Sequence, residues 1–175
     1  MSEYDAIPDE GVDGEELLET MRGFAQADVE WEDGKTWALV YYPGDDHYDL
    51  IKRAYNLFMS GNALNPMAFK SLKRMESEVV QMTADMLNGG PDTVGTMTSG
   101  GTESILMAVK AARERASKLK TFGGTPEVVA PRTIHPAFAK AAHYFGLNLV
   151  RTPLRDDWRA DVEALEDAIS RKTVL

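Results

Sequence analysis

Apolar residues recur along the chain at the spacing of an amphipathic α-helix in several separate segments. The clearest of these helices carries one apolar stripe, with steps of three and four residues, made of Leu72, Met75, Val79, Met82 and Met86. Asn88-Gly89-Gly90-Pro91 ends it, because glycine and asparagine tolerate left-handed backbone and proline cannot continue a helix. The pattern predicts further helices over residues 15–25, 48–59, 103–119, 136–145 and 160–169.

Short apolar runs between these helices predict strands. Residues 127–131 and 147–152 have the length and composition of buried strands, residues 173–175 begin another, and residues 93–97 form a short extended run. Strands that alternate with helices through short connections indicate an α/β fold built on a parallel sheet. A three-residue strand at the carboxyl end predicts that the sheet continues, so we expect the chain to be truncated.

Composition narrows the class of protein. The chain has 28 acidic and 19 basic residues and a formal net charge of −9, which disfavours nucleic acid and anionic lipid as partners. Without cysteine it has no disulfide and no thiolate ligand, and no metal site is predicted. The acidic start is unlike a signal peptide, and no run of about 18 apolar residues predicts a membrane span. We therefore expect a cytoplasmic protein.

The segment Thr98-Ser99-Gly100-Gly101-Thr102-Glu103-Ser104 joins an extended run to a helix and carries the strongest chemical signal. Glycines let backbone N–H groups approach a ligand closely, and the start of a helix favours a phosphate. The hydroxyls of Ser99, Thr102 and Ser104 could add donors. The alternative is a plain glycine-rich turn whose Ser or Thr caps the helix. The segment matches neither GxxxxGK[ST] nor GxGxxG.

Several segments together resemble the pyridoxal 5′-phosphate (PLP) group II decarboxylase family, in its sphingosine-1-phosphate lyase-like branch. The resemblance runs from about Gly34 to Leu175, and four stretches carry it: ESEVV at 76–80, NGGPD at 88–92, TSGGTESILMA at 98–108 and HPAFAKAAHYFG at 135–146. It implies the aminotransferase fold type I, PLP as cofactor, a homodimer, and cleavage or decarboxylation of an amine or amino-acid substrate. On this basis residues 1–65 form an amino-terminal segment with a candidate dimer contact, and residues 66–175 begin the PLP-binding large domain.

The resemblance also implies roles for individual residues. Gly101 and Thr102 would hold the cofactor phosphate through backbone N–H groups and the Thr102 hydroxyl, and Gly100 would permit the close approach. His135 matches the histidine that stacks on the pyridine ring, where an imidazole could also move a proton. Without the family match, a histidine with no role at the end of a strand would be the better interpretation.

The candidate substrate residues are Tyr41, Asn62 and Asn65. Tyr41 matches a tyrosine that can approach the neighbouring subunit's active site, although an aromatic residue in a core strand explains it equally well. Asn62 and Asn65 lie in a loop that resembles the family's N-x-L-H-P segment, but Asn65 replaces histidine and Ala63 replaces proline. This departure leaves an amino acid open as substrate beside a phosphorylated long-chain amino alcohol.

The groups that complete PLP chemistry are missing from the pattern. A PLP enzyme needs a lysine for the cofactor aldehyde and a carboxylate for the pyridine nitrogen, and no lysine here lies in a matching motif. We therefore expect the chain alone to be inactive. The alternatives are a non-catalytic truncated remnant or dimerisation module, and a simple phosphate binder.

Overall fold

The computed structural model describes residues 7, 9–37 and 39–175. The chain divides into two compact units, with the boundary between Gly61 and Asn62. Residues 1–6 and 8 of the predicted acidic leader lie outside the described residues. No helix in the described part is long and apolar enough to cross a bilayer.

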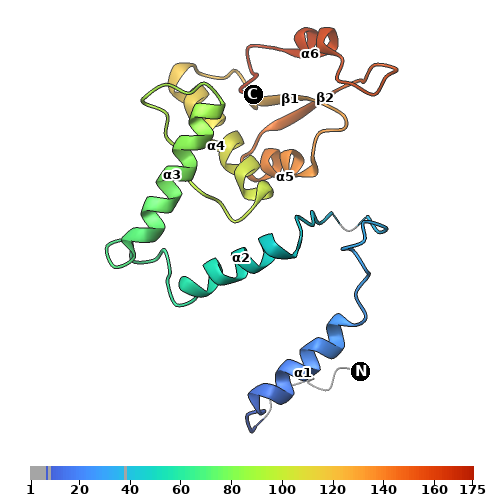
Figure 1. The fold of residues 1–175 in the computed structure, drawn as a ribbon. Helices are drawn as coiled ribbons and strands as arrows, with labels where there is room; N and C mark the ends of the chain where they lie inside the picture. The colour runs from blue at the N-terminus through green and yellow to red at the C-terminus, as the bar shows by residue number, and fades with distance from the viewer. Residues whose placement is uncertain (1–6, 8, 38) are drawn as a thin grey trace. The chain divides into compact units, whose positions relative to one another are not determined.

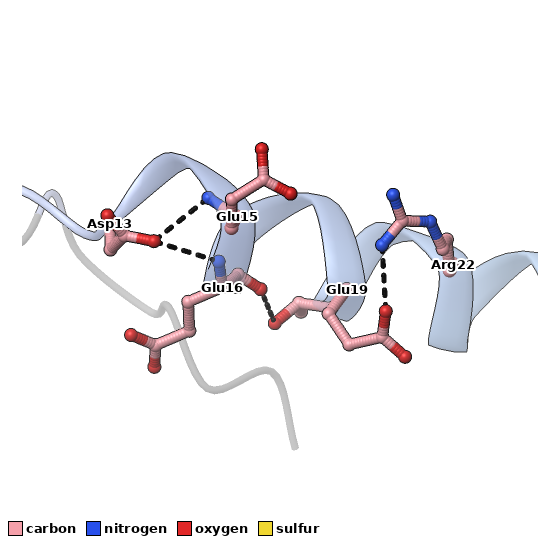
Figure 2. Close-up of polar contacts among 6 residues, drawn as sticks. Asp13, Glu15, Glu16, Glu19 and Arg22 are labelled. Carbon is pink, nitrogen blue, oxygen red and sulfur yellow. Dashed lines mark hydrogen bonds and ion pairs between the residues drawn. The ribbon is translucent and has the colours of Figure 1, made fainter.

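The first unit contains two helices, α1 (Gly14–Ala25) and α2 (Asp45–Leu57), close to the predicted bounds. Local contacts define α1: the Asp13 carboxylate accepts hydrogen bonds from the N–H groups of Glu15 and Glu16, at 3.0 and 3.3 Å (Figure 2). Such an N-cap satisfies donors that have no partner within the helix. Glu19 and Arg22 form an ion pair of 2.8 Å one turn apart (Figure 2).

None of the described residues up to Gly61 is buried. Residues 31–37 and 39–42 contain no strand, so Tyr41 does not lie in a core strand and that interpretation is wrong. A small aromatic group stands there instead: the Tyr42 ring stacks on Tyr48 at 5.6 Å and meets Trp31 edge-on at 5.9 Å between centroids.

The second unit begins with two long helices, α3 (Lys70–Met86) and α4 (Gly101–Leu119). The predicted stop of α3 is confirmed: Leu87 caps the helix and Asn88 adopts left-handed backbone, with φ +56°. Residues 93–97 form no strand, because none of them pairs with another strand among the described residues. Glu76 holds this stretch instead, accepting hydrogen bonds from the Met97 N–H at 2.9 Å and the Thr96 hydroxyl at 3.0 Å.

The α/β pattern follows as predicted: β1 (Glu127–Pro131), α5 (Pro136–Tyr144), β2 (Asn148–Thr152) and α6 (Val162–Ala168). The two strands are parallel and in register from Glu127 opposite Asn148 to Pro131 opposite Thr152. Residues 173–175 lie along the other side of β1, where the Val174 N–H donates to the Glu127 carbonyl at 2.8 Å. The sheet itself has two strands, and residues 173–175 lie along β1 through a parallel bridge between Glu127 and Thr173.

Small and branched residues from α4, β1 and α5, with one residue just before β2, form the core of the second unit: Val109, Val128, Ala141, Ala142 and Leu147. Helices α5 and α6 lie on opposite sides of the two strands (Figure 1). Helix α4 packs against α5, and Arg113 in its second half donates to the carbonyl of Phe145, just past the end of α5, at 3.0 Å. This bond ties the second half of α4 to the end of α5.

Candidate functional site

The amino end of α5 lies at the edge of the sheet at which β1 ends, because α5 follows β1 after a short turn. The glycine turn begins α4, the helix that packs against α5, and His135 begins α5 itself. Asn62 and Asn65 belong to the same unit, and Tyr41 belongs to the first unit.

The glycine turn ends at Gly100, the N-cap residue of α4, which has no side chain to cap the helix. By helix geometry, the N–H groups of Gly101, Thr102 and Glu103 have no acceptor within the helix. A Cβ built on Gly100 or Gly101 would meet nothing within 4 Å, so both glycines face open space. Free donors, an open approach and the positive end of a helix dipole suit a phosphate group.

The hydroxyls of the turn are not equivalent. Ser99 Oγ donates to the Glu103 carboxylate at 2.7 Å, and Ser104 Oγ lies 2.6 Å from Thr98 Oγ1 in a second hydrogen bond. Both groups are used within the turn. Thr102 is different, since its hydroxyl has no hydrogen-bond partner in the part of the chain that the structure describes. Of the three predicted donors, Thr102 is the one left for a ligand.

His135 is the N-cap residue of α5. Its Nδ1 accepts a hydrogen bond from the Ala137 N–H at 3.1 Å, and the side chain lies at the exposed carboxyl end of β1. In the neutral imidazole this bond requires Nδ1 without a proton, so Nε2 carries it. The ring is thereby held at one end while Nε2 is free to donate.

The two asparagines are engaged in their own loop. Asn62 Oδ1 accepts from the Leu64 N–H at 3.1 Å, and Asn65 Oδ1 accepts from the N–H groups of Met67 and Ala68, both at 3.2 Å. These are local turn-forming bonds. A cavity of about 500 Å³ lies beside them, lined by Ala63, Pro66, Phe69, Leu72, Lys73, Glu76 and Met97.

Tyr41 is 93% exposed. Its approach to a neighbouring subunit stays a prediction, as does any role of the asparagines toward a substrate. No group of three potential metal ligands gathers among the described residues.

Two carboxylates that sequence reasoning missed shape the site. Hydrogen bonds from the Ser99 N–H and then its hydroxyl lower the pKa of Glu103, and bonds from the Met97 N–H and the Thr96 hydroxyl lower that of Glu76. For Glu103 a signal existed, since an acidic residue at the third helical position commonly reaches back to N–H groups before the helix. For Glu76 there was none, because its partners lie 20 and 21 residues away.

Comparisons with known proteins show which family the chain resembles. No family model matches the chain. Sphingosine-1-phosphate lyase 1 of Mus musculus is 44% identical over 169 residues, which are 97% of this chain and 29% of the relative. A probable L-tyrosine/L-aspartate decarboxylase of Methanothermobacter thermautotrophicus is 38% identical over 127 residues, 73% of this chain and 33% of the relative.

A solved sphingosine-1-phosphate lyase structure from Burkholderia pseudomallei superposes with a TM-score of 0.86 at 36% identity, covering 98% of this chain and 42% of that one. The chain thus spans about three-tenths of the length of the two curated relatives. By fold and sequence it belongs to the PLP-dependent group II decarboxylase family, with the architecture of fold type I. Within that family its place is the sphingosine-1-phosphate lyase-like branch.

Proposed function

We propose that this chain supplies the cofactor-phosphate-binding part of a PLP-dependent carbon–carbon lyase that acts on an amine substrate. One observation carries the proposal: the start of α4 offers free N–H groups, open glycines and the unengaged Thr102 hydroxyl, in a chain 44% identical to a sphingosine-1-phosphate lyase. Residues 66–175 would begin the PLP-binding domain. Residues 1–65 would form the amino-terminal segment, with a homodimer contact.

The residues of the turn fit a phosphate dianion. Gly101 and Thr102 would bind it through backbone N–H groups, the Thr102 hydroxyl would add a third donor, and the helix dipole would favour the negative charge. Gly100, without a side chain, would leave room for the close approach. When bound, PLP supplies an electron sink that makes a bond near the substrate's amine carbon breakable.

His135 would act from the start of α5. Because the Ala137 N–H holds Nδ1, the imidazole would keep one orientation, and its face could pack against the flat cofactor ring. With Nδ1 engaged, the Nε2–H is the group that His135 could offer as a hydrogen-bond donor to the cofactor or the substrate.

The names of the relatives support two substrate classes. The match to sphingosine-1-phosphate lyases favours retro-aldol cleavage of a phosphorylated long-chain amino alcohol. The match to a probable tyrosine/aspartate decarboxylase, together with Asn65 and Ala63 where the family has histidine and proline, favours an amino acid as the second candidate.

Binding of pyridoxamine 5′-phosphate and of pyridoxamine tests the proposed phosphate site, because neither has an aldehyde that surface lysines could capture. We expect the chain to prefer the phosphorylated probe in equilibrium dialysis. Thr102→Val should lower the affinity for the phosphorylated probe about tenfold, since a hydrogen bond to a charged group contributes about 1.5–3 kcal/mol. The affinity for pyridoxamine should not change. Equal affinity of the unaltered chain for both probes would refute the site.

We also propose that residues 1–175 alone are inactive, since none of their lysines lies in a matching motif. Incubation with PLP, borohydride reduction and peptide mapping should give no adduct or a scatter over exposed lysines. A stoichiometric adduct on one lysine would contradict this part of the proposal and would identify the reactive residue.

A further inference from the structure

Glu103 folds back from the first turn of α4 and engages both donors of Ser99. Its Oε2 accepts from the Ser99 N–H at 2.6 Å and from the Ser99 hydroxyl at 2.7 Å. These two bonds lower the pKa of Glu103, so its carboxylate stays ionised at pH values where an ordinary glutamate would begin to be protonated. Side chain and backbone thus close a ring from Ser99 to Glu103 around Gly100, Gly101 and Thr102.

This ring restrains a backbone that little else restrains. Adjacent glycines have more conformations available than any other pair of residues, and no neighbouring atom lies within 4 Å of where their Cβ atoms would be. Packing therefore does not fix Gly100 and Gly101. Hydrogen bonds do: the Glu103–Ser99 pair and the 2.6 Å bond between Thr98 Oγ1 and Ser104 Oγ close the turn, and the Gly100 carbonyl accepts from the Thr98 hydroxyl at 3.2 Å and from the Ser104 N–H at 3.0 Å.

The Glu103–Ser99 bonds also direct the carboxylate toward Ser99 and away from the helix donors. The carboxylate keeps its negative charge, but it does not occupy the N–H groups that an anion would need. Here Oε2 accepts from Ser99, at the start of the turn, and the helix donors of Gly101 and Thr102 stay free. The N–H and the hydroxyl of Ser99 both donate to Glu103, so the Thr102 hydroxyl is the one available to a ligand.

We propose that Glu103 is a positioning residue for the cofactor phosphate: by holding Ser99, it keeps the N–H groups of Gly101 and Thr102 in the one arrangement that a phosphate can bind. This role rests on the function proposed above. Glu103 acts through Ser99 and does not itself touch the phosphate.

The test compares pyridoxamine 5′-phosphate with pyridoxamine as probes for the full chain, measured by equilibrium dialysis. Glu103→Ala should lower the affinity for the phosphorylated probe about tenfold and change the affinity for pyridoxamine by less than about twofold, because only the phosphate binds the turn. Glu103→Gln keeps one oxygen acceptor and should rescue most of the loss, to about threefold. Should Glu103→Ala fail to fold, the Gln variant carries the test.

Glu163→Ala is the matched control, since Glu163 is likewise acidic and in the first turn of a helix, α6. It should bind both probes as the unaltered chain does. If Glu103→Ala keeps the full preference for the phosphorylated probe, or loses both probes equally while folded, the positioning role is wrong and the proposed function stands. If the unaltered chain and the Glu163 control show no preference, the proposed function fails and the positioning role fails with it.

Discussion

The two units differ in how far apart in the sequence the partners of their side-chain hydrogen bonds lie. In the first unit, every described side-chain hydrogen bond joins residues at most four apart. In the second, Glu76 reaches 21 residues to Met97, Arg113 reaches 32 to Phe145, and Lys120 reaches 53 to Thr173. Local rules thus define the helices of the first unit, whereas non-local contacts define the second.

Burial follows the same division. Val109 and Ala141 of the second unit are fully buried, and no described residue of the first unit is buried. Isolated helices of α1's length are marginal in water, so capping and ion pairs alone stabilise them weakly. The comparison teaches that the second unit has its own core, whereas the described residues of the first unit form none.

The largest effect is expected from a charge placed in the core of the second unit. Val128 is 1% exposed, and Val128→Asp would bury a carboxylate without a partner. The free energy of unfolding should fall by more than about 4 kcal/mol, which denaturant unfolding followed by circular dichroism would measure. A loss below about 1 kcal/mol would show that this core does not hold the unit together.

The same change in the first unit is the control. Leu50 of α2 is 53% exposed, so Leu50→Asp should change the free energy of unfolding by less than about 0.5 kcal/mol. Its effect should appear in self-association, measured by light scattering over a range of concentrations, because a charge would weaken an apolar contact between chains. If Val128→Asp and Leu50→Asp lowered the free energy of unfolding equally, the inferred difference between the two units would be wrong.

Much of the second unit could be predicted because its elements obey local periodicity. Both strands, the α3 stripe and its glycine stop follow from spacing and composition alone. Residues 93–97 and 31–42 were harder, because a strand exists only where a second strand pairs with it, and composition does not supply the partner.

At the site, residue types were predictable and hydrogen-bond partners were not. The glycine turn and His135 were found from the sequence, but which hydroxyl stays free depends on Glu103 and on the Thr98–Ser104 bond. The start of α5 at residue 136 was predicted, but the bond by which His135 caps the helix, from the Ala137 N–H to Nδ1, was not.

A smaller effect is expected from acid, through Glu127 in the second unit. Its carboxylate accepts from the Ser170 hydroxyl at 2.9 Å and from Lys172 Nζ at 3.2 Å, and these bonds lower its pKa. A carboxyl with a lowered folded-state pKa stabilises the fold above its unfolded pKa of about 4.3 and loses that contribution as pH falls through the folded value. The unaltered chain should therefore lose stability faster than Glu127→Gln below about pH 4.3.

Unfolding midpoints measured from pH 7 down to pH 3 check this, with Glu163→Gln as the variant that removes one charge without these contacts. The midpoints of the unaltered chain and of Glu127→Gln should converge toward the acid end. Parallel curves for the two proteins would mean that the contacts of Glu127 with Ser170 and Lys172 add nothing to stability.

The placement of α5 and α6 on opposite faces of the sheet has a topological consequence. The connection that leaves β1 turns toward α5, and the connection that leaves β2 turns toward α6, so the two diverge at the carboxyl edge of neighbouring strands. Open α/β sheets bind ligands outside the carboxyl ends of their strands, which is the edge that both connections leave. Arg151 Nη1 bridges to the Arg132 carbonyl at 3.0 Å just there, and His135 lies on the first of the two connections. The course of the backbone from β1 to α5 therefore determines the edge of the sheet at which His135 lies, independently of side-chain contacts.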